Sequence, residues 1–212
     1  AAIPLILSRR TNKKIIGGVA AAIIVAVFAV EGGYVNNPKD PGGATNHGIT
    51  EQVARQHDYK GDMRDLTREA AQSIYYADYI EKPGYVPMLT IQPVIAEKLV
   101  DGAVNAGPGR ASRWFQTGLN SLNRDQKDYP DVAVDGAVGP KTIAAYMGLE
   151  RARGKVKACE LMLKVLDIQQ GAHYLSLTQL ETFTVGWIDN RIGHIDPARC
   201  AMKDGGFNEP AH

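Results

Sequence analysis

An uncharged, apolar run of sixteen residues, 15–30, constrains the possible folds of this chain more than any other feature. It follows a basic cluster that consists of Arg9, Arg10, Lys13 and Lys14. A helix that is apolar on every side is either buried in a protein core or inserted in a membrane. The run is shorter than the roughly 20 residues of a spanning helix, and its glycines and alanines make it only weakly hydrophobic. We therefore expect either a core helix or a segment that associates transiently with a membrane.

The rest of the chain predicts a mainly α fold. Helices are expected at residues 68–79, 91–105, 111–122, from 140, at 149–174 and at 181–192. Thr67 is a typical N-cap residue, and Pro140 suits the first position of a helix. We expect Gly154 to interrupt or kink the long helix that contains it, and the tail from Asp196 onward to be irregular. No long alternating pattern indicates a strand.

Composition narrows the class of protein. With 212 residues, of which 44% are hydrophobic, the chain is long enough to bury a core. Its net charge of +1 does not indicate the strongly basic surface that nucleic-acid-binding proteins carry. Cys159 and Cys200 fit no metal motif. They are either two buried thiols or a disulfide formed in an oxidising compartment.

A glycine-rich segment, 31–50, holds the residues that best fit catalysis. Glycosidic hydrolysis needs one protonated carboxyl group that donates to the leaving oxygen, and a second carboxylate that stabilises positive charge or activates water. Glu31 follows the apolar run, where partial burial would raise its pKa, and Asp40 lies in a Pro-Gly turn. Thr45 is placed to hold the attacking water. Spacing alone favours a structural explanation, in which Glu31 is a charge at a helix end and Asp40 forms a turn.

The same segment, EGGYVNNPKDPGGATNHGIT, resembles the signature of glycoside hydrolase family 108, lysozymes of phages and prophages. The resemblance implies that Glu31 is the catalytic glutamate and maps the Asp and Thr of the phage lysozyme triad onto Asp40 and Thr45. Four residues separate Asp40 from Thr45, where phage-type lysozymes usually have five, so Thr50 is the alternative for Thr45. The implied reaction uses two carboxyl groups, and we expect no metal or other cofactor.

Further motifs extend the resemblance over most of the chain. Residues 70–79 are similar to an Ile-Tyr helix of the family, and 101–120 to a helical hairpin whose Val-Asn-x-Gly lines the substrate cleft, which assigns substrate binding to Asn105. The turn at 134–146 resembles the family's peptidoglycan-binding region. By that resemblance its Asp135 and Lys141 contact the substrate; in the alternative they only shape the turn.

Aromatic residues allow two interpretations. Tyr34 either stacks on a sugar ring of the substrate or covers the pocket of Glu31 and keeps it dry. Trp114 is expected in the core, and Trp187 is expected in the core rather than as a sugar platform.

The resemblance implies a lysozyme-like, two-lobed helical fold with a cleft between the lobes. We expect residues 1–30 to be an N-terminal apolar segment, 31–120 the catalytic lobe, and 121–212 a helical lobe with the peptidoglycan-binding turn. The apolar segment after a basic cluster is also similar to the anchors of signal-anchor-release endolysins. It resembles a signal peptide too, although the motif that begins at Glu31 follows it at once.

The implied function is that of an endolysin, which cuts the β-1,4 bond between N-acetylmuramic acid and N-acetylglucosamine and lyses the host. The expected partners are glycan strands of peptidoglycan and, through residues 15–30, the inner membrane of the host for a limited time. We expect a monomer in the host periplasm that binds no nucleic acid. The alternatives are a lytic transglycosylase, which needs only one glutamate, and a non-catalytic, membrane-anchored peptidoglycan-binding module.

Overall fold

Helices dominate the chain, as predicted. The computed structural model describes residues 17–27, 33–36, 43–179 and 181–207. Its named helices are α2 (Glu51–Gln56), α3 (Arg68–Tyr76), α4 (Met88–Ile91), α5 (Pro93–Ala106), α6 (Pro108–Leu122), α7 (Pro140–Arg153), α8 (Lys155–Ser176) and α9 (Glu181–Arg191). Shorter turns are the π-helix η2 (Ala77–Glu81) and the 3₁₀ helices η1 (Met63–Asp65) and η3 (Pro197–Ala201). Two short strands, β1 (Thr45–Asn46) and β2 (Ile49–Thr50), form a hairpin.

Local sequence signals set several helix ends. The side chain of Thr67 accepts a hydrogen bond from the backbone N–H of Ala70 and so caps α3, and Pro140 begins α7. The predicted interruption at Gly154 is confirmed, but it separates two helices, so that residues before it belong to α7 and residues after it to α8. The φ of Gly154, 79°, lies in the left-handed region that favours glycine and ends α7 after Arg153.

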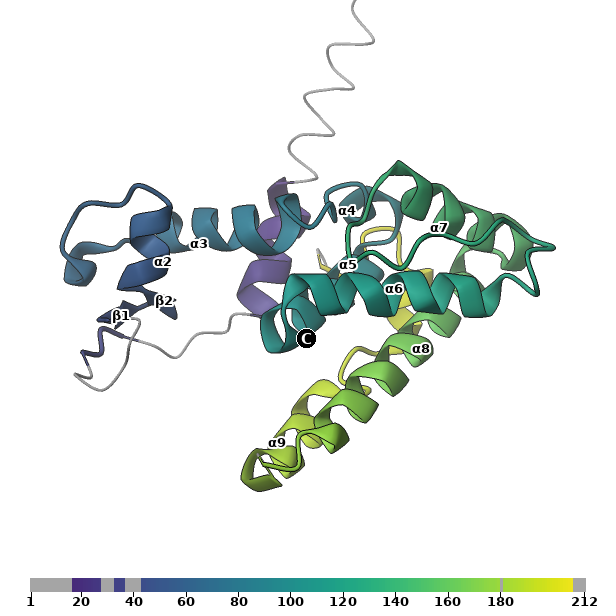
Figure 1. The fold of residues 1–212 in the computed structure, drawn as a ribbon. Helices are drawn as coiled ribbons and strands as arrows, with labels where there is room; N and C mark the ends of the chain where they lie inside the picture. Colours follow the sequence, from purple (N-terminus) through teal and green to yellow (C-terminus); the bar gives the residue numbers. More distant parts are fainter. Residues whose placement is uncertain (1–16, 28–32, 37–42, 180, 208–212) are drawn as a thin grey trace, which may run out of the picture.

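Helix α5 occupies the centre of the core. Every residue from Pro93 to Ala103 is buried. Helices α6 and α8 both pack against α5, and α4 precedes it. Figure 1 shows α7 beside α6 at one end of the molecule. The predicted division at residue 120 falls inside α6, and the two-lobed organisation stays a prediction.

The described part of the apolar run, 17–27, is helical and amphipathic in its burial. Its buried face joins the main core through Val19, Ala20, Ile23, Ile24 and Val27. Its other face is exposed, and Val25 keeps 58% of its surface accessible. Hollows on its two sides are shared with α3 and with the junction of α4 and α5. Among the described residues, none of the helices combines the length and the apolar character that crossing a membrane requires.

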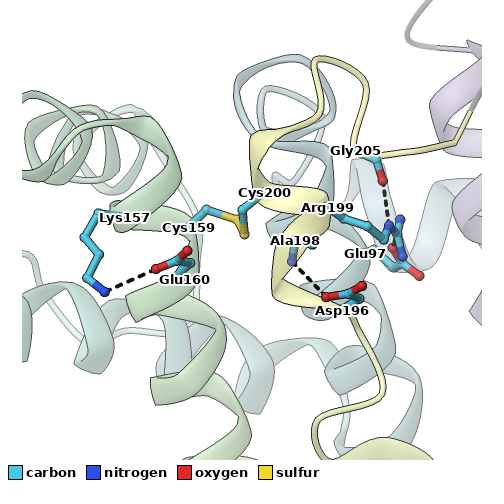
Figure 2. The surroundings of a disulfide bond; sticks show 9 residues. All are labelled: Glu97, Lys157, Cys159, Glu160, Asp196, Ala198, Arg199, Cys200 and Gly205. Carbon is cyan, nitrogen blue, oxygen red and sulfur yellow. Dashed lines mark hydrogen bonds and ion pairs between the residues drawn. A yellow bond between two sulfur atoms is a disulfide. The ribbon is translucent and has the colours of Figure 1, made fainter.

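The C-terminal segment is fixed to the helical body by two different bonds. Cys159 on α8 and Cys200 on η3 form a disulfide, which decides between the two alternatives left open for these residues (Figure 2). Arg199 pairs with Glu97 of α5 at 2.6 Å and donates a further hydrogen bond to the carbonyl of Gly205. The predicted irregular tail therefore contains a short 3₁₀ helix that is firmly attached.

Candidate active site

The β1–β2 hairpin organises the segment that carries the family signature. Thr45 pairs with Thr50 and Asn46 with Ile49, and His47 and Gly48 form the turn with φ values of 49° and 74°. Positive φ at both central positions is the geometry of a tight two-residue hairpin. The sequence had predicted a loop here, so the hairpin corrects that prediction.

Two side chains hold the hairpin against the rest of the molecule. The amide of Asn46, which is buried, donates a hydrogen bond of 2.7 Å to the carbonyl of Met63. The hydroxyl of Tyr75 on α3 donates to the carbonyl of His47 at 2.8 Å. Burial, and secondly the nearby Tyr79, raises the pKa of Tyr75 to about 12, so its hydroxyl stays a donor at physiological pH. The hairpin is therefore anchored at both its strand and its turn.

The two predicted catalytic carboxylates, Glu31 and Asp40, lie outside the described residues, and their roles stay predictions. Their neighbours are described. Val35 forms an antiparallel bridge with Thr45, with backbone hydrogen bonds of 2.7 and 2.8 Å. Val35, which precedes the segment with Asp40, and Thr45, which follows it, are therefore neighbours at the edge of β1.

The hairpin brings Thr45 and Thr50 side by side as a directly paired couple. Side chains of paired strand residues point to the same face of a sheet. The hydroxyl of Thr50 accepts a hydrogen bond from the backbone N–H of Val53 at 3.3 Å and caps α2. Thr50 therefore has a structural role at α2, and the assignment of the water to Thr45 stays a prediction.

Tyr34 lies half-buried in the same lobe. Its ring lies 5.0 Å from the guanidinium of Arg64, in a cation–π contact. It also lines a shallow hollow of about 300 Å³ together with Asn36, Ala44 and Glu51. Since one face of the ring is occupied by Arg64, a sugar that stacks on Tyr34 has to approach from its other face.

Asn105 lies in the last turn of α5, and its amide is held in place. Its Nδ2 donates to the backbone carbonyl of Asp101 at 2.8 Å and to the Asp101 carboxylate at 3.2 Å. Asp101 is fully buried and also accepts hydrogen bonds from Gln170 of α8 and Arg191 of α9. The orientation of the predicted substrate contact therefore depends on a buried charged network.

This network contains buried charged residues that the sequence analysis did not single out. Lys98 is buried, pairs with Asp167 at 2.6 Å and donates to the backbone carbonyl of Arg191 at 2.9 Å. Arg191 in turn pairs with Asp101 at 2.9 Å. The available signal was the group Glu97, Lys98 and Asp101 in a mainly apolar helix, because charged residues are fully buried only when they are paired.

Asp135 and Lys141 lie apart from the hairpin. The carboxylate of Asp135 accepts hydrogen bonds from the N–H of Ala137 at 2.9 Å and from Gln116 at 2.7 Å. These two bonds, the backbone one first, lower the pKa of Asp135. Lys141 is exposed in the first turn of α7. Figure 1 places α7 and the hairpin at opposite ends of the molecule, so Lys141 cannot contact a sugar beside Thr45.

Comparison with known proteins identifies both halves of this arrangement. Residues 24–107 match the family model described as glycosyl hydrolase 108, and residues 110–192 match a predicted peptidoglycan domain. The solved structure of Brucella abortus SagA is similar, with a TM-score of 0.60 and 27% sequence identity over 92% of this chain and 98% of SagA. No curated protein matches the chain in sequence.

The helical fold, the anchored hairpin and the two matched regions define a lysozyme-like enzyme that hydrolyses peptidoglycan. Residues 24–107 of the chain belong to the glycosyl hydrolase 108 family, and a predicted peptidoglycan domain follows them. Peptidoglycan is accordingly its partner.

Proposed function

We propose that the chain is a muramidase that hydrolyses the β-1,4 bond between N-acetylmuramic acid and N-acetylglucosamine. The observation that carries this proposal is the match of residues 24–107 to glycosyl hydrolase 108, because that span contains Glu31, Asp40 and Thr45. In the proposed mechanism Glu31 protonates the leaving oxygen, while Asp40 stabilises the developing positive charge or activates water. Thr45 positions the water beside the sugar.

Contacts of the β1–β2 hairpin support this assignment of roles. The backbone of Thr45 is held by its bridge to Val35 and by its pairing with Thr50. We assign substrate contacts to Asn105, which the Asp101 network orients, and to the open face of Tyr34. Asp135 and Lys141 would serve the peptidoglycan domain rather than the cleavage site.

Replacement of Glu31 by Gln tests the mechanism. It removes the proton donor but keeps the size of the side chain, and loss of general acid catalysis costs about 10²–10⁴ in rate. We expect lysis of permeabilised cells to fall by that factor while thermal unfolding is unchanged. Glu69→Gln, an exposed carboxyl at the start of α3, is the matched control and should keep full activity. Full activity of Glu31→Gln would remove Glu31 from the mechanism.

The products separate the muramidase from its alternatives. Mass spectrometry of digested peptidoglycan should show reducing N-acetylmuramic acid ends, whereas 1,6-anhydro ends would indicate a lytic transglycosylase. Strong binding to cell walls without any cleavage would indicate a non-catalytic module. Asp40→Ala should be severe and Thr45→Ala milder, because a second carboxylate contributes more charge stabilisation than a hydroxyl.

We further propose that the enzyme is a monomeric endolysin that lyses its host from the periplasm, after transient association with the inner membrane through residues 15–30. The disulfide supports an oxidising compartment, since disulfides persist there and are rare in the cytosol. The exposed apolar face of residues 17–27 supports contact with lipid. In this proposal the buried face observed here belongs to the released, active enzyme.

Leucine at Gly17 and Gly18 tests the membrane step. A Cβ atom at either position has nothing within 4 Å, so we expect the soluble fold to accommodate a larger side chain there. Each leucine favours insertion by about 0.3–0.6 kcal/mol at a helix centre. We expect more protein in the membrane fraction and later lysis after induction. If the amount of protein in the membrane fraction and the time of lysis are unchanged, residues 17–27 act only as a core helix.

A further inference from the structure

Five aromatic side chains on α6, α8 and α9 form a continuous series of ring contacts. The ring centroids are 5.7 Å apart for Trp114 and His173, and 6.1 Å for His173 and Tyr174. Tyr174 stacks on Trp187 at 5.2 Å and 28°, and Trp187 stacks on Phe183 at 5.8 Å and 27°. We call these five residues the aromatic ladder.

The outer end of the ladder is open to solvent. Phe183 keeps 57% of its surface exposed, although it is a large apolar side chain. Along α9, every side chain from 182 to 191 is exposed or half-buried. In Figure 1 the turn between α8 and α9 projects away from the other helices. Apolar surface that is presented in this way is characteristic of a binding site.

Polar groups accompany the rings at the inner end. Arg110 lies 3.1 Å from Nε2 of His173, and Gln169 donates to the carbonyl of Trp114 at 2.8 Å. Burial, and secondly the charge of Arg110, lowers the pKa of His173, which keeps the imidazole neutral and able to accept from Arg110. Aromatic faces beside hydrogen-bonding groups suit a ligand that has both apolar and polar surface.

A sugar ring is such a ligand, because its C–H face is apolar and its edge carries hydroxyl and amide groups. The electron-rich face of an aromatic ring attracts the weakly positive C–H groups of the sugar. The whole ladder lies within residues 110–192, the region that matches a predicted peptidoglycan domain. We propose that the aromatic ladder binds the glycan strand of peptidoglycan, with a sugar ring stacked on the open face of Phe183.

This proposal rests on the proposed function and adds a second contact with the same polymer. In Figure 1 the α8–α9 turn and the hairpin lie in separate parts of the molecule. Two linked contacts on one polymer raise the effective concentration of the enzyme at the wall without changing the chemistry of cleavage. The ladder should therefore matter for insoluble cell walls and not for short soluble fragments.

Substitutions at Phe183 test the proposal by co-sedimentation with purified cell walls, in a Glu31→Gln background that prevents cleavage. Phe183→Leu keeps an apolar side chain but removes the aromatic face, and should weaken binding about ten-fold, a change within the range of aromatic stacking. Phe183→Tyr keeps the aromatic face and should bind normally. Val185→Ala is the matched control, since Val185 is 80% exposed on the same helix but outside the ladder.

Intrinsic fluorescence gives a second, direct measurement. The chain has two tryptophans, and both belong to the ladder. Titration with an N-acetylglucosamine oligomer should produce a saturable change in emission that Phe183→Leu greatly weakens. Unchanged cell-wall binding of Phe183→Leu would overturn the proposal. So would a dimer in sedimentation velocity that this variant converts to monomer, because the surface would then join two copies of the chain.

Failure of the proposed function would look different. With Glu31 intact, Phe183→Leu should cleave short soluble peptidoglycan fragments at the normal rate, and its KM should rise only on intact walls. If no variant cleaves any substrate, the hydrolytic function fails while the binding result stands by itself.

Discussion

Helix α9 and the 3₁₀ helix η3 follow one another in the chain but are attached in different ways. Only the C-terminal end of α9 is attached by buried charges, where Lys98 binds its last carbonyl and Asp101 binds Arg191. The attachment of η3 is covalent, through Cys200. Helix α9 is thus held by buried charges and ring stacking, whereas the attachment of η3 also depends on redox state.

Helix α5 nevertheless takes part in holding both elements, because Arg199 of η3 also pairs with Glu97. Glu97, Lys98 and Asp101 are all buried in this central helix, and each binds a partner from the C-terminal part of the chain. Fully buried charges are costly unless they are paired. Their presence in α5 is therefore explained by partners in α8, α9 and η3, and substitutions in α5 and in its partners should distinguish the two attachments.

The largest expected effect comes from Asp101→Asn. It leaves buried Lys98 and half-buried Arg191 with Asp167 as their one counter-charge among the described residues, and breaking a buried pair costs about 3–5 kcal/mol. The free energy of unfolding, measured by denaturant titration, should fall by that amount. Hydrogen exchange should accelerate first in α9. Equal acceleration in α9 and η3 would show that the two attachments are not separate.

Replacing both cysteines by serine should have the next largest effect. The disulfide closes a loop with a sequence separation of 41 residues, and removing such a cross-link costs about 2–4 kcal/mol. Thermal unfolding of the double variant should match that of the wild-type protein under reducing conditions. Hydrogen exchange should now accelerate in residues 197–207 and not in α9, the reverse of the Asp101→Asn result.

Arg199→Met should have the smallest of the three effects. It removes the 2.6 Å pair with buried Glu97, and a hydrogen bond to a charged group contributes about 1.5–3 kcal/mol. Glu160→Gln, which breaks the exposed pair with Lys157 shown in Figure 2, should cost no more than about 1 kcal/mol. A larger loss from Glu160→Gln than from Arg199→Met would contradict the importance assigned to burial.

Sequence signals predicted those parts of the fold that depend on neighbouring residues. Thr67 and Pro140 act within a few positions of themselves, and the structure confirms both helix starts. The ion pair of Arg191 could not be predicted in the same way, because its partner Asp101 is 90 positions away. The disulfide between Cys159 and Cys200 was left open for the same reason.

The β1–β2 hairpin shows a second limit of prediction from sequence. Its turn residues, His47 and Gly48, adopt positive φ together, but a histidine is a weaker turn signal than the asparagine or aspartate usual before glycine. The capping role of Thr50 was also missed, since the same residue had been considered for catalysis. The signature around Glu31 and Asp40 identified the enzyme family correctly, while the positions of these two side chains lie outside the described residues.

The burial of α5 has a consequence for engineering chimeric peptidoglycan hydrolases. The helix belongs to the span that matches the hydrolase family, yet α6 and α8, which cover it, belong to the span that matches the peptidoglycan domain. Dividing the chain at Gly107 would follow the boundary between the two matched regions. It would nevertheless expose the apolar surface of α5 to solvent. Modules exchanged at this point need a partner with a complementary surface, so this enzyme is better transplanted whole than assembled from halves.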